Sequence, residues 1–283
     1  MSYKSELIRK IPDPLYIRIQ YLHHFGKLPN LRNPSTFNEK MQWLKIHDHN
    51  PVYTTLVDKV KVKSYIANKI GEQYVIPTIG VWDSADKIDF SLLPNQFVIK
   101  CNHDSHGVIV CRDKTKIDVK EMKAKLQKRL DSNGYYYGRE WPYKNVEKRI
   151  LAEEYISDGT GELVDYKVHN FNGEPKVILV CRNRFGSTGL QEDFFDTSWR
   201  LMDVKRPNAS HGEAIDRPEG LDLMLELSKT LSKGFPFLRT DFYYVKGRVL
   251  FGELTLYPAS GYQAFVPESY DKLFGEWINL KKR

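Results

Sequence analysis

Short apolar segments alternate with amphipathic stretches through most of the chain. Four segments between residues 74 and 156 carry runs of Val, Ile, Leu and aromatic residues, which predict short buried strands. These segments are YVIPTIGVW, FVIKCN, GVIVCR and RILAEEYI. Further on, DYKVHNFNGEPKVILVCRNR predicts a hairpin that turns at Asn172-Gly173. Strands joined by short turns pair antiparallel, so we expect largely antiparallel sheets.

Helical patterns occupy three other parts of the sequence. Residues 1 to about 56 favour helices that break at prolines, and Asp58 predicts the start of a helix that Gly71 ends. Asp118 indicates the start of a second helix with an apolar face. Pro218 indicates the start of a third. Helices and hairpins together predict an α+β fold.

The segment FLRTDFYYVKGRVLFGELTLYPASG, residues 237–261, predicts another hairpin but carries charges inside its strands. Successive strand residues face opposite sides of a sheet, so Asp241 and Glu253 share a face only if the turn has an odd number of residues. We therefore expect a three-residue loop with Gly247 in a left-handed bulge. The even-numbered apolar residues would then face the core: Leu238, Phe242, Leu250, Leu254 and Leu256. The alternative is a solvated face whose charges pair across the strands.

The composition changes this picture little. The 283 residues are 41% hydrophobic, and the formal net charge is +7. An anionic ligand is plausible, but the basic residues are too evenly spread to favour nucleic acid. The three cysteines lack metal-ligand spacing and predict reduced, buried thiols. Because the chain shows no signal-peptide segment and no apolar run of membrane length, we expect a cytoplasmic protein without a membrane span.

No GxGxxG or Walker-type phosphate loop is present. Six fragments instead resemble, in their order and spacing, the ATP-grasp ligases and more closely their TupA-like branch. The fragments are VDKVKVKSYI, LPNQFVIKCNHDSHG, ILAEEYI, DYKVHNFNGEP, FLRTDFYY and FGELTLYPASGYQAFVP. The resemblance runs from about residue 36 to about residue 275. It implies two α+β lobes that clasp ATP, over residues 58–157 and 158–283, preceded by a helical segment over residues 1–57.

The resemblance also implies the nucleotide contacts. Lys59 and Lys100 match the two lysines that approach the phosphates, and Lys167 could reach a phosphate from a neighbouring strand. Glu153 would accept a hydrogen bond from the adenine amino group. The remaining predicted nucleotide contacts are the hinge residues Glu154, Tyr155 and Ile156, together with Asp165, which matches the acidic residue that binds the ribose hydroxyls.

The charged hairpin is similar to the metal-binding strands of this family. Asp241 and Glu253 would hold Mg²⁺ between the phosphates, because hard oxygen ligands are what this ion prefers. Thr255 stands where the wider superfamily usually has Asn, and would bind the metal through water or not at all. Arg239 would stabilise the transferring phosphoryl group and the tetrahedral intermediate.

The segment that matches the phosphate flap, CNHDSHG, departs from the family pattern. Asp104 and His106 stand where small residues are expected. An aspartate beside a triphosphate is repelled unless it faces away or meets a metal, so ATP turnover depends on where Asp104 points. A zinc site built on His103 and His106 is the alternative for this segment.

The TupA-like branch implies a ligase that joins an amine or amino acid to a uronic acid of a bacterial surface polysaccharide. Arg182 and Arg184 could grip the substrate carboxylate in a fork, which would make Arg182 part of the catalytic site. The aromatic residues of 135–144 could stack on sugar rings or simply form an ordered corner. Two other functions stay open: a glycosyltransferase that uses a nucleotide sugar, and a non-catalytic glycan binder.

Overall fold

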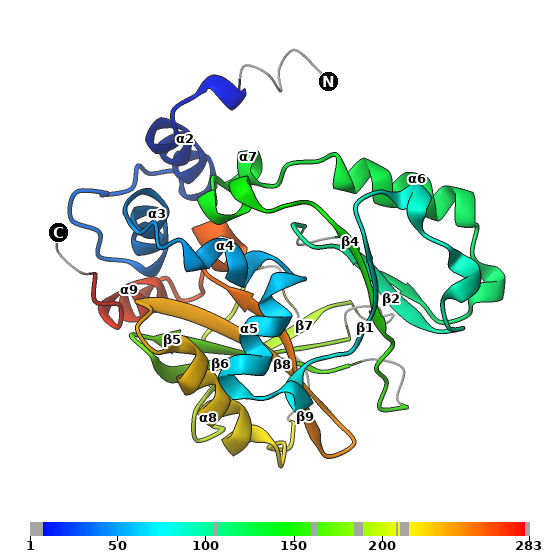
Figure 1. Cartoon of the computed structure of the whole chain (residues 1–283). Helices are drawn as coiled ribbons and strands as arrows, with labels where there is room; N and C mark the ends of the chain where they lie inside the picture. Colours follow the sequence, from blue (N-terminus) through cyan, green and yellow to red (C-terminus); the bar gives the residue numbers. More distant parts are fainter. Residues whose placement is uncertain are drawn as a thin grey trace.

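The computed structural model describes residues 8–104, 107–159, 163–183, 189–207, 209 and 215–280, and it contains two antiparallel sheets with helices around them (Figure 1). The helices are α2 (Asp13–Phe25), α3 (Phe37–His47), α4 (Val52–Val57), α5 (Lys61–Ile70), α6 (Val119–Leu130), α7 (Tyr135–Gly138), α8 (Leu221–Ser232) and α9 (Ser269–Glu276). The strands are β1 (Thr78–Trp82), β2 (Phe97–Cys101), β3 (Ile109–Cys111), β4 (Ile150–Glu154), β5 (Asp165–Phe171), β6 (Glu174–Arg182), β7 (Gln191–Asp196), β8 (Phe237–Val245) and β9 (Arg248–Thr255).

The smaller sheet has four strands in the order β1–β4–β2–β3. Helix α6 covers one of its faces, and the buried side chains of Leu126, Phe97 and Ile99 belong to the core between them. As predicted, α6 begins after Asp118, whose carboxylate accepts the backbone N–H of Glu121 at 2.9 Å. This sheet therefore carries the predicted flap segment and hinge strand on a core of its own.

The larger sheet has five strands in the order β7–β6–β5–β8–β9. Its core also takes in side chains from α3, α4, α5, α8 and α9, so helices distant in sequence pack on one sheet. Phe37 of α3, for example, makes edge-to-face ring contacts with Phe237 of β8 and Phe274 of α9. Val62 and Ile66 of α5 join this same core. The proposed boundaries at residues 57 and 157 stay a prediction.

One strand of the larger sheet was not predicted. Strand β7 has the sequence QEDFFD, in which four of six residues are polar, so its pattern does not indicate a buried strand. Glu192 and Asp193 are nevertheless buried, because Arg206 pairs with the first at 2.6 Å and Arg182 pairs with the second at 3.1 Å. The remaining strands confirm the largely antiparallel α+β fold. In the described ranges, no helix is both long and apolar enough to cross a membrane.

Candidate active site

The charged hairpin turns differently from the prediction. Val245 pairs with Arg248, so the turn has only two residues, Lys246 and Gly247, with φ of 50° and 77°. The extra, unpaired residue that the shared face requires lies instead within β9, where Gly252 forms a bulge. A Cβ atom at Gly252 would lie 3.2 Å from the carbonyl oxygen of Asp241, a distance tighter than most such contacts. Glycine therefore permits the bulge.

The bulge brings the two predicted metal ligands to one face. Asp241 and Glu253 are direct partners across β8 and β9, whereas Phe242 pairs with Phe251. Leu250 consequently pairs with Tyr243 on the charged face and is absent from the large core, contrary to the prediction. The convergence of the two carboxylates is thus as expected, but it comes from a bulge within the strand and not from the turn.

Asp241 lies at the centre of a buried ion network. Its carboxylate accepts two hydrogen bonds from Arg239, both of 2.7 Å, and one of 2.6 Å from Lys167 on the neighbouring strand β5. Burial raises the pKa of Asp241, but the charges of Arg239 and Lys167 outweigh this effect and hold the pKa at about 2. The carboxylate is therefore ionised at neutral pH, as a metal ligand must be.

Glu253 forms an ion pair with Lys59, which lies just before helix α5. Lys59 Nζ lies 2.7 Å from Glu253 Oε1, and about one third of the Glu253 side chain is exposed. Burial raises the pKa of Glu253, but the charge and hydrogen bond of Lys59, together with the charge of Arg239, bring the net pKa below the usual range. Glu253, a predicted metal ligand, thus already has a cation as its partner.

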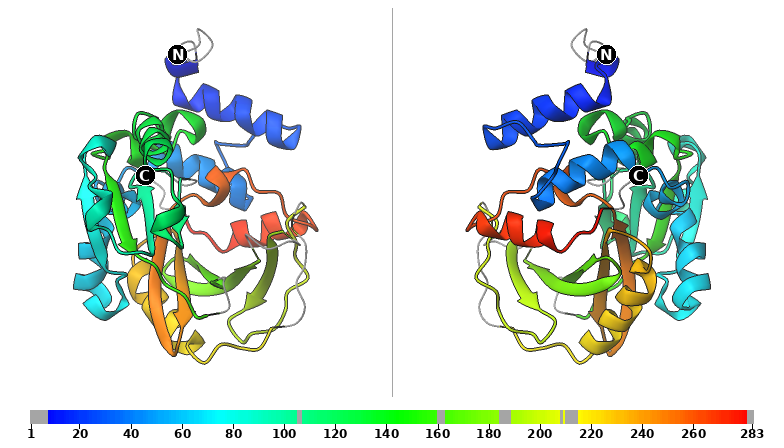
Figure 2. Two further views of the ribbon diagram at one scale, coloured as in Figure 1. Left: turned by 90° about the vertical axis from the view of Figure 1, so that its right-hand side faces the viewer. Right: turned by 90° about the vertical axis from the view of Figure 1, so that its left-hand side faces the viewer.

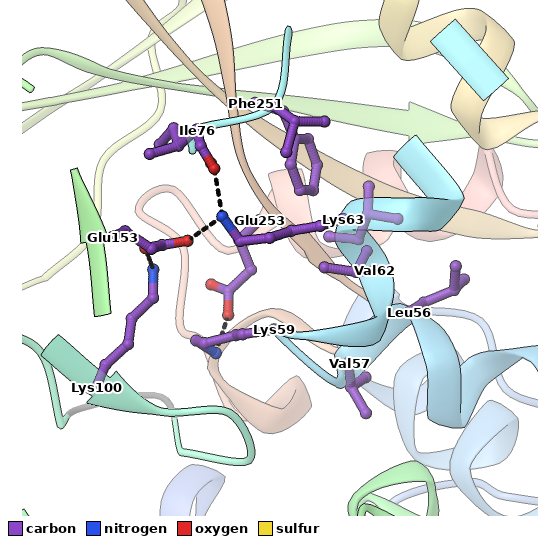
Figure 3. Close-up of a pocket in the computed structure, with 13 residues that line it drawn as sticks. Leu56, Val57, Lys59, Val62, Lys63, Ile76, Lys100, Glu153, Phe251 and Glu253 are labelled. Carbon is purple, nitrogen blue, oxygen red and sulfur yellow. Dashed lines mark hydrogen bonds and ion pairs between the residues drawn. The ribbon is translucent and has the colours of Figure 1, made fainter. Parts of the chain in front are cut away.

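Two further lysines meet at Glu153 on β4 (Figure 3). Lys63 Nζ lies 2.6 Å from one carboxylate oxygen, and Lys100 Nζ pairs with the other. Burial raises the pKa of Glu153, but the two lysines together bring it below the usual range. Lys63 was missed in the sequence. The signal was available, since Lys63 follows Lys59 by four residues, a spacing that would place both on one face of the helix predicted to start at Asp58.

These groups line a pocket between the two sheets and α5 (Figure 3). Three lysines and two glutamates form its charged part, which carries a net positive charge: Lys59, Lys63, Lys100, Glu153 and Glu253. Apolar side chains form the remaining wall: Leu56, Val57, Val62, Val75, Ile76, Phe251 and Leu254. An apolar wall beside converging lysines suits a ligand with one flat apolar end and one anionic end.

The sequence pattern of the family described as TupA-like ATPgrasp matches residues 39–279. The chain belongs to the TupA-like ATP-grasp family. The match includes every strand of both sheets and all the residues that line the pocket. The predicted family, and with it the ATP-grasp fold, is therefore confirmed.

Similar folds occur among solved structures of ATP-grasp ligases. D-alanine–D-alanine ligase from Bacillus anthracis, complexed with ATP, shares 16% identity with a TM-score of 0.42, over 71% of this chain and 54% of that one. The corresponding ligase from Helicobacter pylori shares 14% with a TM-score of 0.44, over 87% and 70%. The ligase PsnB, complexed with a precursor variant, Mg and ADP, shares 10% with a TM-score of 0.41, over 77% and 57%. This chain thus spans little more than half of the B. anthracis ligase. No curated protein matches the sequence.

The other predicted nucleotide residues are not among those that line the pocket. Asp165 and Lys167 pair with each other on β5, beside Asp241. Glu154 ends β4 with an exposed side chain, and its backbone N–H donates to the carbonyl of Pro77 at 3.1 Å. The next two hinge residues, Tyr155 and Ile156, are half-buried. Their roles toward adenine and ribose stay predictions.

The structure separates Arg182 from the other predicted catalytic residues. Cys181 pairs with Asp165 and so shares the face of the charged cluster, which places Arg182 on the opposite face of the sheet, with Asp193. The predicted carboxylate fork is therefore not brought to the cluster, and Arg184 lies outside the described residues. Thr255, in contrast, is half-buried and pairs directly with Arg239.

Asp104 of the flap segment forms an ion pair with a side chain of α6. Its carboxylate bonds Arg129 Nη1 of α6 at 2.5 Å, so its charge is compensated within the smaller lobe. His103 is buried against the carbonyl of Ser132, with its Nε2 at 3.2 Å, while His106 lies outside the described residues. Within the described part of the chain, no group of three or more His, Cys, Asp and Glu side chains is arranged to hold a metal.

The aromatic segment 135–144 forms an ordered corner. Arg139 is only 2% exposed and donates to the carbonyl of Ile8 at 2.6 Å, and the Tyr135 hydroxyl donates to Asp13 at 2.5 Å. These contacts attach α2 to α7. Arg139 and Tyr135 are thereby committed to packing, which favours the structural interpretation of this segment over sugar stacking.

The loop after β9 adjoins a lysine that sequence reasoning missed. Ala259 and Ser260 both have positive φ, of 46° and 55°, which is a strained conformation for residues other than glycine. Buried Lys45 of α3 holds this turn, since its Nζ donates to the Ser260 carbonyl at 2.6 Å and to the Gly138 carbonyl at 2.7 Å. Burial lowers the pKa of Lys45 to about 7. Helix α3 thus positions the loop that follows strand β9.

His169 predicts a pH dependence of stability. It is buried opposite Arg239, and burial, aided by that charge, lowers its pKa to about 3. Between pH 6.5 and 3 the unfolded chain therefore binds a proton that the folded protein does not, so stability falls as the pH falls. Between pH 6.5 and 5 this loss is about 2 kcal/mol. Urea unfolding at both pH values should show this loss reduced in His169→Gln, and unchanged in a control at exposed His23.

Proposed function

We propose that this protein is an ATP-dependent carboxylate–amine ligase that acts through an acyl phosphate. The observation that carries the proposal is the pairing of Asp241 with Glu253 across β8 and β9, at the edge of a pocket that three lysines enter. Both carboxylates are ionised, and each is held by cations. This arrangement matches what a metal–triphosphate complex requires, namely two hard anionic ligands for the metal and several cations for the phosphates.

Asp241 and Glu253 would hold Mg²⁺, with Thr255 able to contribute through water. When bound, the ion neutralises charge on the phosphates. Lys59 would then leave Glu253 for a phosphate oxygen, because the divalent ion replaces it beside the carboxylate. Lys100 would move in the same way from Glu153, which keeps Lys63 as a partner. Binding thus exchanges ion pairs within the protein for ion pairs with the ligand.

In the proposed reaction, an oxygen of the substrate carboxylate attacks the γ-phosphorus of ATP, and ADP leaves. The nitrogen of an amine or amino acid then attacks the acyl carbon, an amide forms and phosphate leaves. Arg239, held in place by Asp241, would stabilise the charge that develops in both steps. We propose a uronic acid of a bacterial surface polysaccharide as the carboxylate substrate and the cytoplasm as the location.

Two measurements test this function. Mg²⁺ with ATP should raise the thermal midpoint, and ADP release should require a uronic acid and an amine together. Stabilisation by a nucleotide sugar alone would instead support a glycosyltransferase. Stabilisation by neither nucleotide would support a glycan binder without catalysis. ADP release that is independent of the acid would contradict an acyl phosphate intermediate.

Lys100→Ala should raise the KM for ATP roughly 10- to 100-fold, because a charge-assisted hydrogen bond to phosphate is lost. The fold should tolerate the change, since Glu153 retains Lys63 at 2.6 Å. Steady-state ADP release at varied ATP measures the effect, and exposed Lys87, which pairs with Asp83, gives a matched Lys→Ala control. An unchanged KM would remove Lys100 from the phosphate site.

A further inference from the structure

Helix α2 is apolar on both of its faces. Tyr16, Ile17 and Tyr21 are buried against the rest of the protein, as expected for a packed helix. The outward face carries Leu15 and Ile19, which are 51% and 47% exposed, and also Leu22 at 46%. These three residues follow at spacings of four and three, so they form one stripe along the helix. A helix with apolar side chains on its solvent face implies an additional contact.

More exposed apolar side chains gather beside this stripe. Ile8 precedes the helix and Leu28 follows it, with exposures of 40% and 63%. Tyr137, 78% exposed, adjoins the packed side of the same helix, where its carbonyl accepts the hydroxyl of Tyr16 at 3.2 Å. Among the described residues, six of the thirteen exposed large hydrophobic side chains therefore lie in this corner. Figure 2 shows α2 at one end of the molecule, beyond α3 and away from the larger sheet.

The charges around the stripe are almost all positive. Within residues 8–32 the sequence has five basic residues, Arg9, Lys10, Arg18, Lys27 and Arg32, and a single acidic one. That acidic residue, Asp13, is bound to Tyr135 and Arg139, so its charge does not offset the charges of the five basic residues at the surface. Lys27 pairs with Glu268, whereas Arg18 is exposed between Leu15 and Leu22 on the stripe itself.

We propose that this surface, defined by Leu15, Arg18, Ile19 and Leu22, docks on an anionic lipid bilayer. Apolar side chains fit the boundary of the acyl chains, and arginines at the same level fit the acidic headgroups. A second copy of the chain fits less well, because a symmetric contact through the stripe would bring the two Arg18 side chains together. The proposal does not depend on the ligase reaction, since the surface shares no residue with the pocket.

Sedimentation with vesicles tests the proposal. The full chain should sediment with an equal mixture of phosphatidylglycerol and phosphatidylcholine, more than with phosphatidylcholine alone, and less as sodium chloride is raised. The variant Leu15→Ser/Ile19→Ser/Leu22→Ser should lower binding roughly tenfold or more. The variant Leu92→Ser/Leu201→Ser alters two apolar side chains that are exposed elsewhere, and should bind as the wild type does.

The thermal midpoint of each variant, with and without Mg²⁺ and ATP, shows whether the fold and the pocket are intact. Equal binding to both lipid compositions, or equal binding by the triple variant, would overturn the proposal. So would sedimentation equilibrium showing a dimer that the triple variant abolishes, in the absence of vesicle binding. That result would assign the surface to a second copy.

Discussion

Replacement of Glu253 by Gln should lower ATP turnover roughly 100- to 1,000-fold while the protein stays folded. Glutamine keeps the size of the side chain and one carbonyl oxygen, but it lacks the negative charge that a hard cation requires. The fold should tolerate the change because the side chain is about one third exposed, and the amide oxygen can still accept from Lys59. ADP release at saturating ATP, measured across a series of Mg²⁺ concentrations, gives the effect.

The matched control is Glu174→Gln. Glu174 also pairs with a lysine, Lys229 at 2.8 Å, but on the surface and away from the pocket. Its replacement should leave both turnover and the Mg²⁺ requirement unchanged. Normal ATP consumption by Glu253→Gln at every Mg²⁺ concentration would defeat the assignment of this residue to the metal.

The hairpin shows what local sequence signals determine and what they leave open. Alternating residues identify the two strands, and Lys246-Gly247 suits a two-residue turn with positive φ at both positions. The bulge at Gly252 was not predicted, because the extra residue that puts Asp241 and Glu253 on one face was expected in the turn. A lone glycine inside a strand is itself a signal for a bulge, and here it stands next to Glu253.

Buried charges were the other limit of sequence reasoning. Strand β7 was missed because Glu192 and Asp193 resemble solvent-exposed residues until their arginine partners are known. Arg182 was predicted to grip the substrate carboxylate because it follows an apolar strand, yet the alternation of strand residues puts it on the face opposite the charged cluster. Such partners come from separate strands and loops, so a single sequence without the fold does not reveal them.

The resemblance brought together Lys100, Glu153 and Glu253, which the structure places in the lining of one pocket, whereas Arg239 and Asp241 are not among its lining residues. It did so because the order of the fragments along the chain reflects which strands meet in space. The resemblance did not show which ion pairs these side chains form in the absence of a ligand. The lysines predicted to bind phosphates are already paired with glutamates, so a nucleotide bound there would replace existing ion pairs.

Replacement of Asp241 by Asn should abolish turnover as well, but at a cost to stability that Glu253→Gln does not have. The Asp241 side chain is only 4% exposed and compensates both Arg239 and Lys167. An amide of the same shape leaves two buried cations without their common anion, which we expect to cost about 3–5 kcal/mol. The thermal midpoint should therefore fall by roughly 10 °C.

Asp271→Asn provides the matched control for this loss. Asp271 is also buried, but its Oδ1 accepts the backbone and side-chain N–H groups of Asn38, both at 2.9 Å, which an amide oxygen can still accept. The pH dependence of the stability difference between wild type and Asp241→Asn gives a second test. Because the pKa of Asp241 is about 2, its contribution is present above pH 4 and is lost as the pH falls toward 2. The difference between wild type and Asp241→Asn should shrink over that interval, and a difference that stays constant would show that the charge of Asp241 does not stabilise the fold.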